Sequence, residues 1–257
     1  MKLNLTIDNA NRTLTFEEDG IHREVPLFSR KAYEVLSREW LRVGWAMGSF
    51  FTFSWAGQPM LQLPEDVVRL QEVVYEIKPE VIVETGVCWG GSQLFHATLC
   101  EAIGKGRVIG VDIKIPDSVR QAVAANRLAP RITLIEGDSA APEIVAKVRA
   151  LVGDAGPVMV ILDSNHSKAH VLRELEAYAP FVTPGACIIA EDGVMHDLAD
   201  VPGGNPDWIH NNPTEAARQF AAAHREFEMR QPAWKFNRGE LRSNVTYWPD
   251  GWLWRKS

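Results

Sequence analysis

The sequence predicts an α/β protein built on a doubly wound, mostly parallel β-sheet. Short β-branched runs alternate with helical stretches from about residue 80 onward. These runs are continuously apolar, which is typical of strands buried on both faces. Helices between successive strands favour right-handed crossovers that cover both faces of the sheet. At 257 residues, the chain is long enough for one such domain with an appendage.

Residues 1–60 are predicted to form an N-terminal arm. The segment MKLNLTIDNANRTLTFEEDG alternates apolar and polar residues, which predicts a β-hairpin rather than a secretion signal. A helix is expected over RKAYEVLSREWLRVGWAM, followed by the Gly- and Phe-rich stretch GSFFTFSWAGQPM. Residues 61–257 are interpreted as the main domain.

The main domain is predicted to begin with a helix and to continue as alternating strands and helices. Glu65 and Asp66 open the first helix and Pro79 ends it. The expected strands are EVIVETG, RVIGVDI, RITLIEGD, VMVILDS and ACIIAED. The expected helices between them include SQLFHATLCEAIG, PEIVAKVRALVG and KAHVLRELEAYAPFV. Two strand-like pieces around Arg238 and Gly239 are expected to add an antiparallel pair to one edge of the sheet.

Composition excludes several classes of protein. The chain has 27 basic and 33 acidic residues, a net charge of −6, and no basic cluster, which disfavours a nucleic-acid partner. No apolar run approaches the roughly 20 residues needed to span a bilayer, so no membrane partner is expected. The three cysteines lack metal-type spacing and imply no disulfide framework. We expect a cytoplasmic protein with a small-molecule substrate.

Each expected strand ends in acid, and ligands of open α/β sheets bind beyond these strand ends. A single Asp at such a position often only caps the following helix, but the repetition along the sheet predicts a ligand site. The acids are Glu84, Asp112, Asp138, Asp163 and the pair Glu191 and Asp192.

The loop ETGVCWGGS, residues 84–92, leads from a strand into a helix, as a nucleotide-binding turn does. Cys88 stands where the dinucleotide fingerprint needs a close backbone approach, and the nearby acids would repel a pyrophosphate. S-adenosylmethionine, which is cationic and carries a ribose, suits this environment, and Asp112 is expected to accept a ribose hydroxyl. Trp89 is expected to wall the pocket. The alternative is that the glycines serve only a tight turn.

Asp163, Glu191 and Asp192 predict a site for a hard cation. Adjacent strands lie about 4.8 Å apart, so these carboxylates should converge. Oxygen ligands without cysteine favour Mg²⁺. The alternative is a carboxyl cluster that takes up protons or pairs with arginine. His166 is a candidate general base because histidine titrates near neutral pH; the alternative is a helix-start or hydrogen-bonding residue.

With ETGVCWGGS, GVDI, GDS, DSNHSKAHV and EDG in this order, the chain resembles the cephalosporin hydroxylase / rhamnosyl O-methyltransferase family. The resemblance covers about residues 55–255, and its most specific part is DSNHSKAHV followed by EDG. It implies a class I, Rossmann-like methyltransferase with a seven-stranded sheet. It also implies a Mg²⁺-dependent O-methyltransferase of antibiotic-attached or polysaccharide sugars.

The resemblance implies roles for individual residues. Asp163, Glu191 and Asp192 match the metal ligands, and His166 matches the base. The expected donor-binding residues are Glu84, Gly86, Trp89, Gly91, Ser92, Asp112, Asp138, Ser139 and Asp163. Asp138 and Ser139 are expected near the adenine. Iron-dependent oxygenation is not expected, because no triad with two histidines is evident.

A long Gly-, Pro- and Asn-rich segment follows the acid pair, centred on residues 194–213. We expect it to form part of the acceptor pocket, with Trp208 or His210 contacting a sugar; the alternative is a mobile surface loop. The N-terminal arm and the nine tryptophans predict a homo-oligomer, a dimer or larger.

The predicted reaction is methyl transfer from S-adenosylmethionine to a hydroxyl of a rhamnose-like deoxysugar on a natural product or glycan. Asp163 would help to bind Mg²⁺ and His166 would take the proton. One alternative is a catechol-type O-methyltransferase acting on an aromatic diol. Another is a non-catalytic protein that binds S-adenosylmethionine. An NAD-dependent oxidoreductase is the least favoured reading because of Cys88.

Overall fold

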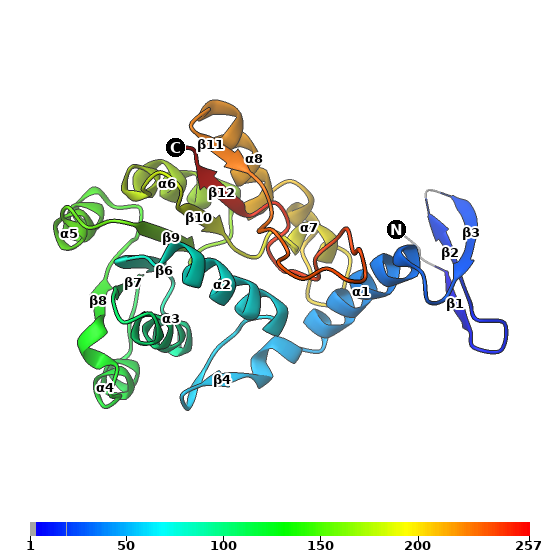
Figure 1. Cartoon of the computed structure of the whole chain (residues 1–257), viewed down its shortest axis with the longest axis horizontal. Coiled ribbons are helices and arrows are strands. Elements are labelled where there is room, and N and C mark those ends of the chain that lie inside the picture. The colour runs from blue at the N-terminus through cyan, green and yellow to red at the C-terminus, as the bar shows by residue number, and fades with distance from the viewer. Residues whose placement is uncertain (1–3, 19) are drawn as a thin grey trace.

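The computed structural model describes residues 4–18 and 20–257, and a twisted sheet covered by helices forms its centre (Figure 1). The strands of this sheet are β6 (Val81–Thr85), β7 (Arg107–Asp112), β8 (Ile132–Glu136), β9 (Val158–Leu162), β10 (Cys187–Ala190), β11 (Phe227–Met229) and β12 (Trp252–Arg255). Among the described residues they make seven strands in the order β11-β12-β10-β9-β6-β7-β8.

The strands from β6 to β10 pair in parallel, which confirms the predicted doubly wound sheet. The chain moves outward from β6 to β7 and β8, and then returns to β9 on the other side of β6. The strand order therefore reverses between β6 and β9, and this is the point at which open α/β sheets bind their ligands.

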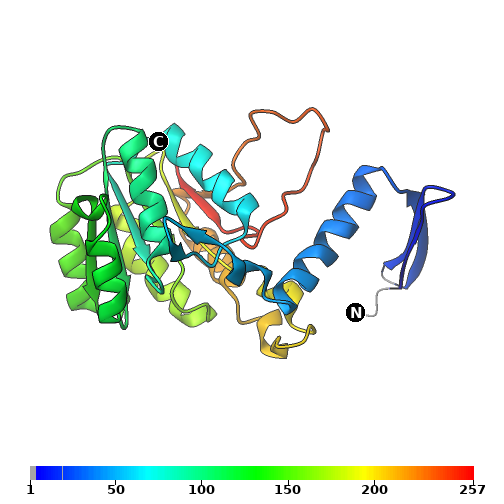
Figure 2. The ribbon, with the colours of Figure 1, turned by 90° about the horizontal axis from the view of Figure 1, so that it is seen from below.

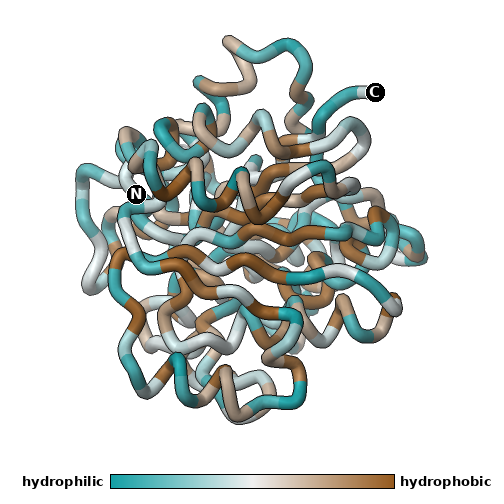
Figure 3. The backbone as a smooth tube through the Cα atoms, turned by 90° about the vertical axis from the view of Figure 1, so that its left-hand side faces the viewer, coloured by the Kyte–Doolittle hydropathy of each residue, from teal (hydrophilic) through white to brown (hydrophobic). Residues whose placement is uncertain are grey.

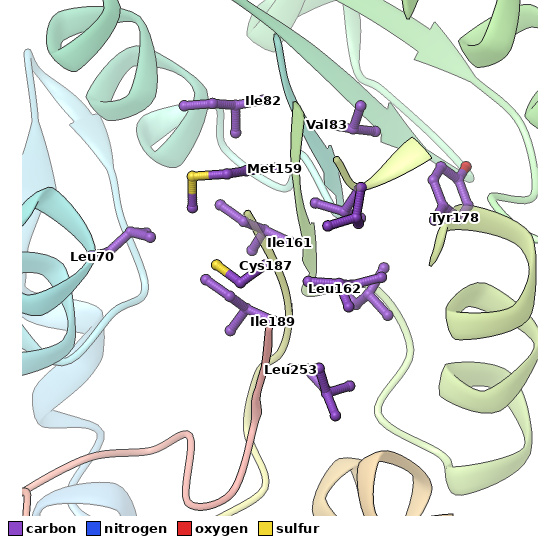
Figure 4. Close-up of a cluster of buried hydrophobic side chains, with 14 of the residues drawn as sticks. Leu70, Ile82, Val83, Met159, Ile161, Leu162, Tyr178, Cys187, Ile189 and Leu253 are labelled. Atoms are coloured by element: carbon purple, nitrogen blue, oxygen red, sulfur yellow. The ribbon is translucent and has the colours of Figure 1, made fainter. Parts of the chain in front are cut away.

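Helices cover both faces of the sheet. They are α2 (Pro64–Ile77), α3 (Gly91–Ala102), α4 (Asp117–Ala124), α5 (Pro142–Val152), α6 (Lys168–Tyr178) and α8 (Pro213–Ala223), with short 3-10 helices η2 (Ala129–Arg131) and η3 (Ala179–Phe181). Figure 4 shows Leu70 of α2 on one side of the strands and Tyr178 of α6 on the other. All residues of β6, β9 and β10 are buried, as their continuous apolar runs predict. Figure 3 shows these hydrophobic strands passing through the middle of a more hydrophilic exterior.

The antiparallel strands at the C-terminal edge of the sheet lie at other residues than predicted. An antiparallel pair does extend the sheet, but it is formed by β11 and β12 and not by pieces around Arg238 and Gly239. Asn237 forms a local turn there, because its backbone carbonyl accepts from Glu240 N and its side chain accepts from Leu241 N. Those donors are thus satisfied locally and not by a ladder. Trp252 in β12 is fully buried, which explains why this strand reaches the sheet.

The N-terminal arm projects from the main body (Figures 1 and 2). Its strands β1 (Leu5–Asp8), β2 (Thr13–Glu18) and β3 (Ile21–Pro26) form an antiparallel sheet, followed by α1 (Arg30–Ala46). The hairpin of β1 and β2 is as predicted, and β3 extends it; residues 1–3 and 19 of the predicted hairpin lie outside the described residues. Leu14, Phe16 and Ala32 form a small separate core for the arm.

The arm joins the main domain through η1 (Ser49–Thr52), β4 (Ser54–Trp55) and β5 (Gln58–Pro59). The segment after β10 folds into α7 (Met195–Leu198) and η4 (Pro206–Ile209). It is therefore more regular than the long loop expected from its composition. Within the described residues, no helix has the length and apolar character needed to cross a membrane.

Candidate functional site

A cavity of about 820 Å³ opens at the carboxyl ends of the parallel strands. Its walls come from the loop after β6, from the ends of β7 to β10, and from residues in the ranges 45–61 and 194–198 and near 247. The volume lies in the range of pockets that bind drug-sized ligands. The predicted residues that line it are Gly86, Trp89, Asp112, Asp138, Ser139, Asp163, His166 and Asp192.

The loop after β6 reaches the cavity in a conformation that requires glycine. Gly86 has a φ of +97°, and a Cβ there would lie 2.0 Å from the backbone oxygen of Asp163. The loops after β6 and β9 are therefore in direct contact at this point. Trp89 is 52% exposed at the cavity wall, in agreement with its predicted place.

Asp112 at the end of β7 holds this loop in place. Its Oδ2 accepts hydrogen bonds from Val87 N at 2.8 Å and from Cys88 N at 3.0 Å. Its Oδ1 accepts from Lys114 N at 3.1 Å. Carboxylate oxygens have further lone pairs, so the side chain can still accept a ligand hydroxyl in the cavity.

Three predicted donor-binding residues, Glu84, Gly91 and Ser92, lie outside the cavity lining. Glu84 is 1% exposed and accepts a hydrogen bond from Ser92 Oγ at 3.1 Å and another from the Gln93 side chain. A Cβ on Gly91 would lie 2.2 Å from the carbonyl oxygen of Pro59. In this structure the contacts of these residues belong to the turn from β6 into α3, and their part in donor binding stays a prediction.

Asp163, His166 and Asp192 form the cluster that is best placed to bind a metal ion. One potential ligand atom from each lies within 4.8 Å of the others. His166 Nε2 lies 3.5 Å from Asp192 Oδ2 and 4.0 Å from Asp163 Oδ1. Asp192 has a left-handed φ of +58°, a conformation that is uncommon for non-glycine residues but that Asp adopts more readily than most.

Glu191 lies beside this cluster, next to Asp163, but does not itself line the cavity. It is 2% exposed, and its Oε2 accepts a hydrogen bond from Gln62 Nε2 at 2.6 Å. The same Gln62 nitrogen donates to Asp163 Oδ2 at 3.2 Å. Gln62 thus bridges two of the predicted metal ligands, and nothing in its local sequence predicts this role.

The electrostatics of the cluster fit a bound cation. Burial raises the pKa of Asp163 and of Glu191 well above the ordinary carboxyl value, and neighbouring carboxylates raise it further. Burial also raises the pKa of Asp192, although His166 opposes this. Within the described part of the chain, no Lys or Arg forms an ion pair with Asp163, Glu191 or Asp192. This disagrees with the alternative of pairing with arginine, and oxygen-rich ligands suit a hard divalent ion.

Ser139 and Asp138 lie at another part of the wall. Asp138 Oδ1 accepts a hydrogen bond from Ala140 N at 3.0 Å, so one of its oxygens stabilises the loop after β8. His170 of α6 also lines the cavity, although the sequence assigned it no role.

The segment 194–213 contributes to the cavity through its first residues. Val194, Met195 and Leu198 line it, whereas Trp208 and His210 do not. The Trp208 ring packs edge-on against Trp45 at 5.5 Å between centroids. The apolar ring is therefore used in packing. His210 is exposed and lies outside the cavity wall, so its contact with a sugar stays a prediction.

Further lining residues come from the chain around the predicted arm boundary and from the segment before β12. They are Trp45, Phe50, Leu61 and Tyr247. The Phe50 and Tyr247 rings meet edge to face at 6.1 Å. Sequence reasoning missed these residues; the aromatic richness of the two segments is the only signal that pointed to them.

Comparisons with known proteins show the family of the chain. The chain matches the family described as Rhamnosyl O-methyltransferase/CmcI over residues 48–256. The Rhamnosyl O-methyltransferase of Mycobacterium leprae (strain TN) is 35% identical over 165 residues, which cover 62% of this chain and 69% of that protein. The protein of the same name from Mycobacterium tuberculosis (strain ATCC 25618 / H37Rv) is 29% identical over 143 residues, covering 55% of this chain and 57% of that protein.

A solved structure named for CmcI with Mg and SAM has a TM-score of 0.54 and is 22% identical, covering 80% of this chain and 78% of that one. At this identity, the likeness shows a shared fold. The N-terminal β-sheet, residues 5–26, lies outside the range that matches the family.

Proposed function

Because the chain belongs to the Rhamnosyl O-methyltransferase/CmcI family, we propose that it methylates a hydroxyl of a rhamnose-like deoxysugar on a natural product or glycan, with S-adenosylmethionine as methyl donor and Mg²⁺ as cofactor. The family membership confirms the resemblance seen in the sequence motifs and the assignment as an O-methyltransferase. The solved CmcI structure named with Mg and SAM supports both proposed cofactors.

The observation that carries this proposal is the meeting of two sites in one cavity. The acid cluster around Asp163 and the loop held by Asp112 share the same walls, because Gly86 contacts the backbone of Asp163. A donor at the loop and an acceptor at the acids would therefore lie side by side. Such proximity converts a bimolecular transfer into an effectively unimolecular one.

The residues at the acid end have distinct proposed roles. Asp163, Asp192 and Glu191 would hold Mg²⁺, which when bound lowers the pKa of an acceptor hydroxyl and orients its oxygen. His166 would take the hydroxyl proton, because its Nε2 lies beside two of these acids and faces the cavity. The carboxylates of Asp163 and Asp192 would keep the His166 ring oriented.

The residues at the other end would bind the donor. Asp112 would accept a ribose hydroxyl while it holds the loop backbone, and Trp89 would cover the ligand from the exposed side. Asp138 and Ser139 are proposed to lie near the adenine. The acidic walls favour the sulfonium and ammonium charges of S-adenosylmethionine and disfavour a pyrophosphate.

Calorimetric titration tests the class of ligand. Chelator-treated protein should bind S-adenosylmethionine, with or without added Mg²⁺, and should not bind NAD⁺ under the same conditions. Binding of NAD⁺ in place of S-adenosylmethionine would refute the proposed class of enzyme.

A second candidate acceptor is an aromatic diol, as in catechol-type methyltransferases. Phe50, Met195, Leu198 and Tyr247 give the cavity an apolar wall, and the polar segment with Trp208 lies outside it. The relatives named Rhamnosyl O-methyltransferase favour a sugar acceptor. Competition between a rhamnosylated phenol and a simple catechol, with one labelled donor, separates the two candidates by which product forms first.

We also propose a homo-oligomer in which the N-terminal arm takes part. Trp40, Met47 and Phe51 are 63%, 78% and 62% exposed on or just after α1. Exposed apolar side chains of this size are typical of protein interfaces. Light scattering at micromolar concentration should give a mass of at least two chains; a monomer would refute this proposal. The cytoplasmic location stays a prediction from the sequence.

A further inference from the structure

We propose that His170 and Glu174 of α6 are positioning residues that fix the two sides of the cavity, donor and metal, relative to each other through Ser139 and Ser164. This inference rests on the proposed function, since it assigns the two sides of the cavity to the donor and the metal. It adds residues to the site that neither the sequence nor the family comparison singled out.

The Glu174 side chain contacts both the loop after β8 and the loop after β9. Ser164 Oγ donates to Glu174 Oε1 at 2.7 Å, and Ser139 Oγ donates to the same oxygen. Ser139 follows β8 at the proposed donor side, and Ser164 comes directly after Asp163 at the proposed metal side. A single carboxylate oxygen therefore sets the distance between the two loops.

His170 completes this arrangement from the cavity side. Its Nε2 lies 3.2 Å from both serine hydroxyls and 3.3 Å from Glu174 Oε1. His170 and Glu174 are four residues apart on α6 and so project from the same face of the helix. Tyr178 extends this row, since its hydroxyl donates to the Ser139 carbonyl at 2.8 Å.

The hydrogen bonds assign the proton on the His170 ring. Arg173 Nη2 lies 2.9 Å from His170 Nδ1, and a guanidinium can only donate. Nδ1 therefore accepts, which leaves the proton of the neutral ring on Nε2, facing Glu174 and the serines. The ring can then bridge the carboxylate and the hydroxyls without rearrangement.

Burial of Glu174 indicates a purpose other than stability. The residue is fully buried, and its Oε2 has no hydrogen-bond partner among the described residues. Burying a carboxylate with one unpaired oxygen costs free energy that an apolar residue at the same place would avoid. Retained polar networks of this kind specify one geometry, and here that geometry belongs to the two loops.

Glu174 holds serines of the cavity wall and does not itself line the cavity. Ser164 neighbours a proposed metal ligand, and both serines and His170 line the cavity. Outer-shell partners orient the groups that contact the ligand, and their loss weakens ligand binding without removing any direct contact. Because one unit supports both sides, its loss should weaken donor binding and metal binding together.

The test compares His170→Leu with His170→Gln in calorimetric titrations of S-adenosylmethionine and, separately, Mg²⁺. Leu removes the Nε2 donor, so both Kd values should rise by about tenfold or more, the range seen for outer-shell partners. Gln carries an amide donor that can still reach Glu174, so both Kd values should stay within about threefold of wild type on the same scale. Glu174→Leu, which removes the oxygen that accepts from both serines, should also weaken the binding of both ligands.

His224→Leu is the matched control. His224 stacks on Phe220 with 4.0 Å between ring centroids, pairs with Glu176 at 2.9 Å, and does not line the cavity. Its loss should leave both Kd values unchanged. Thermal melts of all variants identify any loss that reflects unfolding, and the Gln rescue keeps the test decisive if His170→Leu is unstable.

Loss of donor affinity alone in His170→Leu would make His170 a simple donor contact and would overturn the positioning role. Unchanged Kd values, or equal impairment of His170→Gln and His170→Leu, would overturn it as well. Failure of the proposed function looks different, because wild-type protein would then not bind S-adenosylmethionine at all.

Discussion

At the scale of single residues, the site is made of buried and half-buried acids that, among the described residues, form no ion pair with a Lys or Arg. Burial raises the pKa values of Asp163 and Glu191 well above the ordinary value, and Asp192 and Glu84 add to this for Asp163. Ionising these groups in the metal-free protein costs free energy of folding. Acids that destabilise the fold in this way indicate a functional site. Their effects on stability and on catalysis can therefore be measured separately.

Asp163→Asn should stabilise the metal-free protein and abolish activity. Above the unfolded pKa of about 4, the wild-type carboxylate opposes folding, because its folded-state pKa is raised and the unfolded chain releases the proton more easily. In chelator at pH 8, the melting temperature of the variant should exceed that of wild type, at about 2–4 °C per kcal/mol for a chain of this size. Mg²⁺ should raise the melting temperature of wild type but not of the variant. A lower melting temperature in chelator would contradict the electrostatic account.

His166→Gln separates a proton acceptor from a metal ligand. If His166 is the base, kcat should fall by about 10²- to 10⁴-fold, because general base catalysis is worth that much. The Kd for Mg²⁺, measured by calorimetry, should stay near the wild-type value. A large loss of Mg²⁺ affinity would instead show that His166 is a metal ligand. Its Nε2 lies 3.5 Å from Asp192 Oδ2, close enough for the two side chains to bind one ion.

At the scale of elements, the loop from β6 into α3 has little freedom to change. Gly86→Ala should destabilise the protein by about 1–3 kcal/mol and weaken S-adenosylmethionine binding, because the new Cβ meets the Asp163 backbone in a left-handed conformation. Gly57→Ala is the matched control, since Gly57 has a φ of +85° with nothing within 4 Å. If both variants lose the same stability and keep donor binding, the contact between the loops after β6 and β9 does not contribute to donor binding.

Helix α2 is joined to the segment before β12 by one buried carboxylate. Asp66 accepts hydrogen bonds from Thr246 Oγ1 at 2.5 Å and from Tyr247 N at 2.7 Å. Burial raises the pKa of Asp66 to about 7, against the opposing effect of these two hydrogen bonds. Tyr247 lines the cavity, so this clamp also supports the acceptor wall.

The raised pKa of Asp66 sets the sign of a pH dependence. Between the unfolded pKa of about 4 and the folded value of about 7, the folded protein binds the proton more tightly, so stability falls as pH rises. Asp66→Asn should remove this part of the slope, because an amide does not titrate in this pH range. Its amide oxygen can still accept the hydrogen bond from Tyr247 N. Melts at pH 5 and pH 8, with Mg²⁺ present throughout, should show the variant gaining on wild type as pH rises. A constant difference between the two proteins would show that Asp66 does not titrate in this range.

The strands and the strand-end acids could be predicted because each depends on a local pattern. Continuous apolar runs indicate buried parallel strands, and an acid at the end of each run meets the others at one edge of the sheet. Gln62 and Tyr247 could not be predicted in this way, since each joins the site from a segment distant in sequence. The packing of Trp208 against Trp45 could not be predicted either, because a tryptophan in a polar loop gives the same local pattern whether it binds sugar or packs against another ring.

At the scale of the whole molecule, the arm and the catalytic domain are less separate than a boundary at residue 60 suggests. Arg38 pairs with Asp197 at 2.7 Å and Arg42 pairs with Asp200 at 2.9 Å, which ties α1 to the segment around α7. Trp45 at the end of α1 then lines the cavity. The end of α1 therefore completes the cavity wall, and residues 61–257 alone would leave that wall incomplete.

The central claim is that this cavity transfers a methyl group in a metal-dependent way. The most direct measurement is transfer of labelled methyl from S-adenosylmethionine to a panel of rhamnosylated phenols and glycans, with Mg²⁺ and with chelator. We expect a labelled sugar with Mg²⁺, none in chelator, and none with Asp163→Ala, whose fold is checked by circular dichroism. Transfer that proceeds at the same rate in chelator, or in Asp163→Ala, would contradict the account.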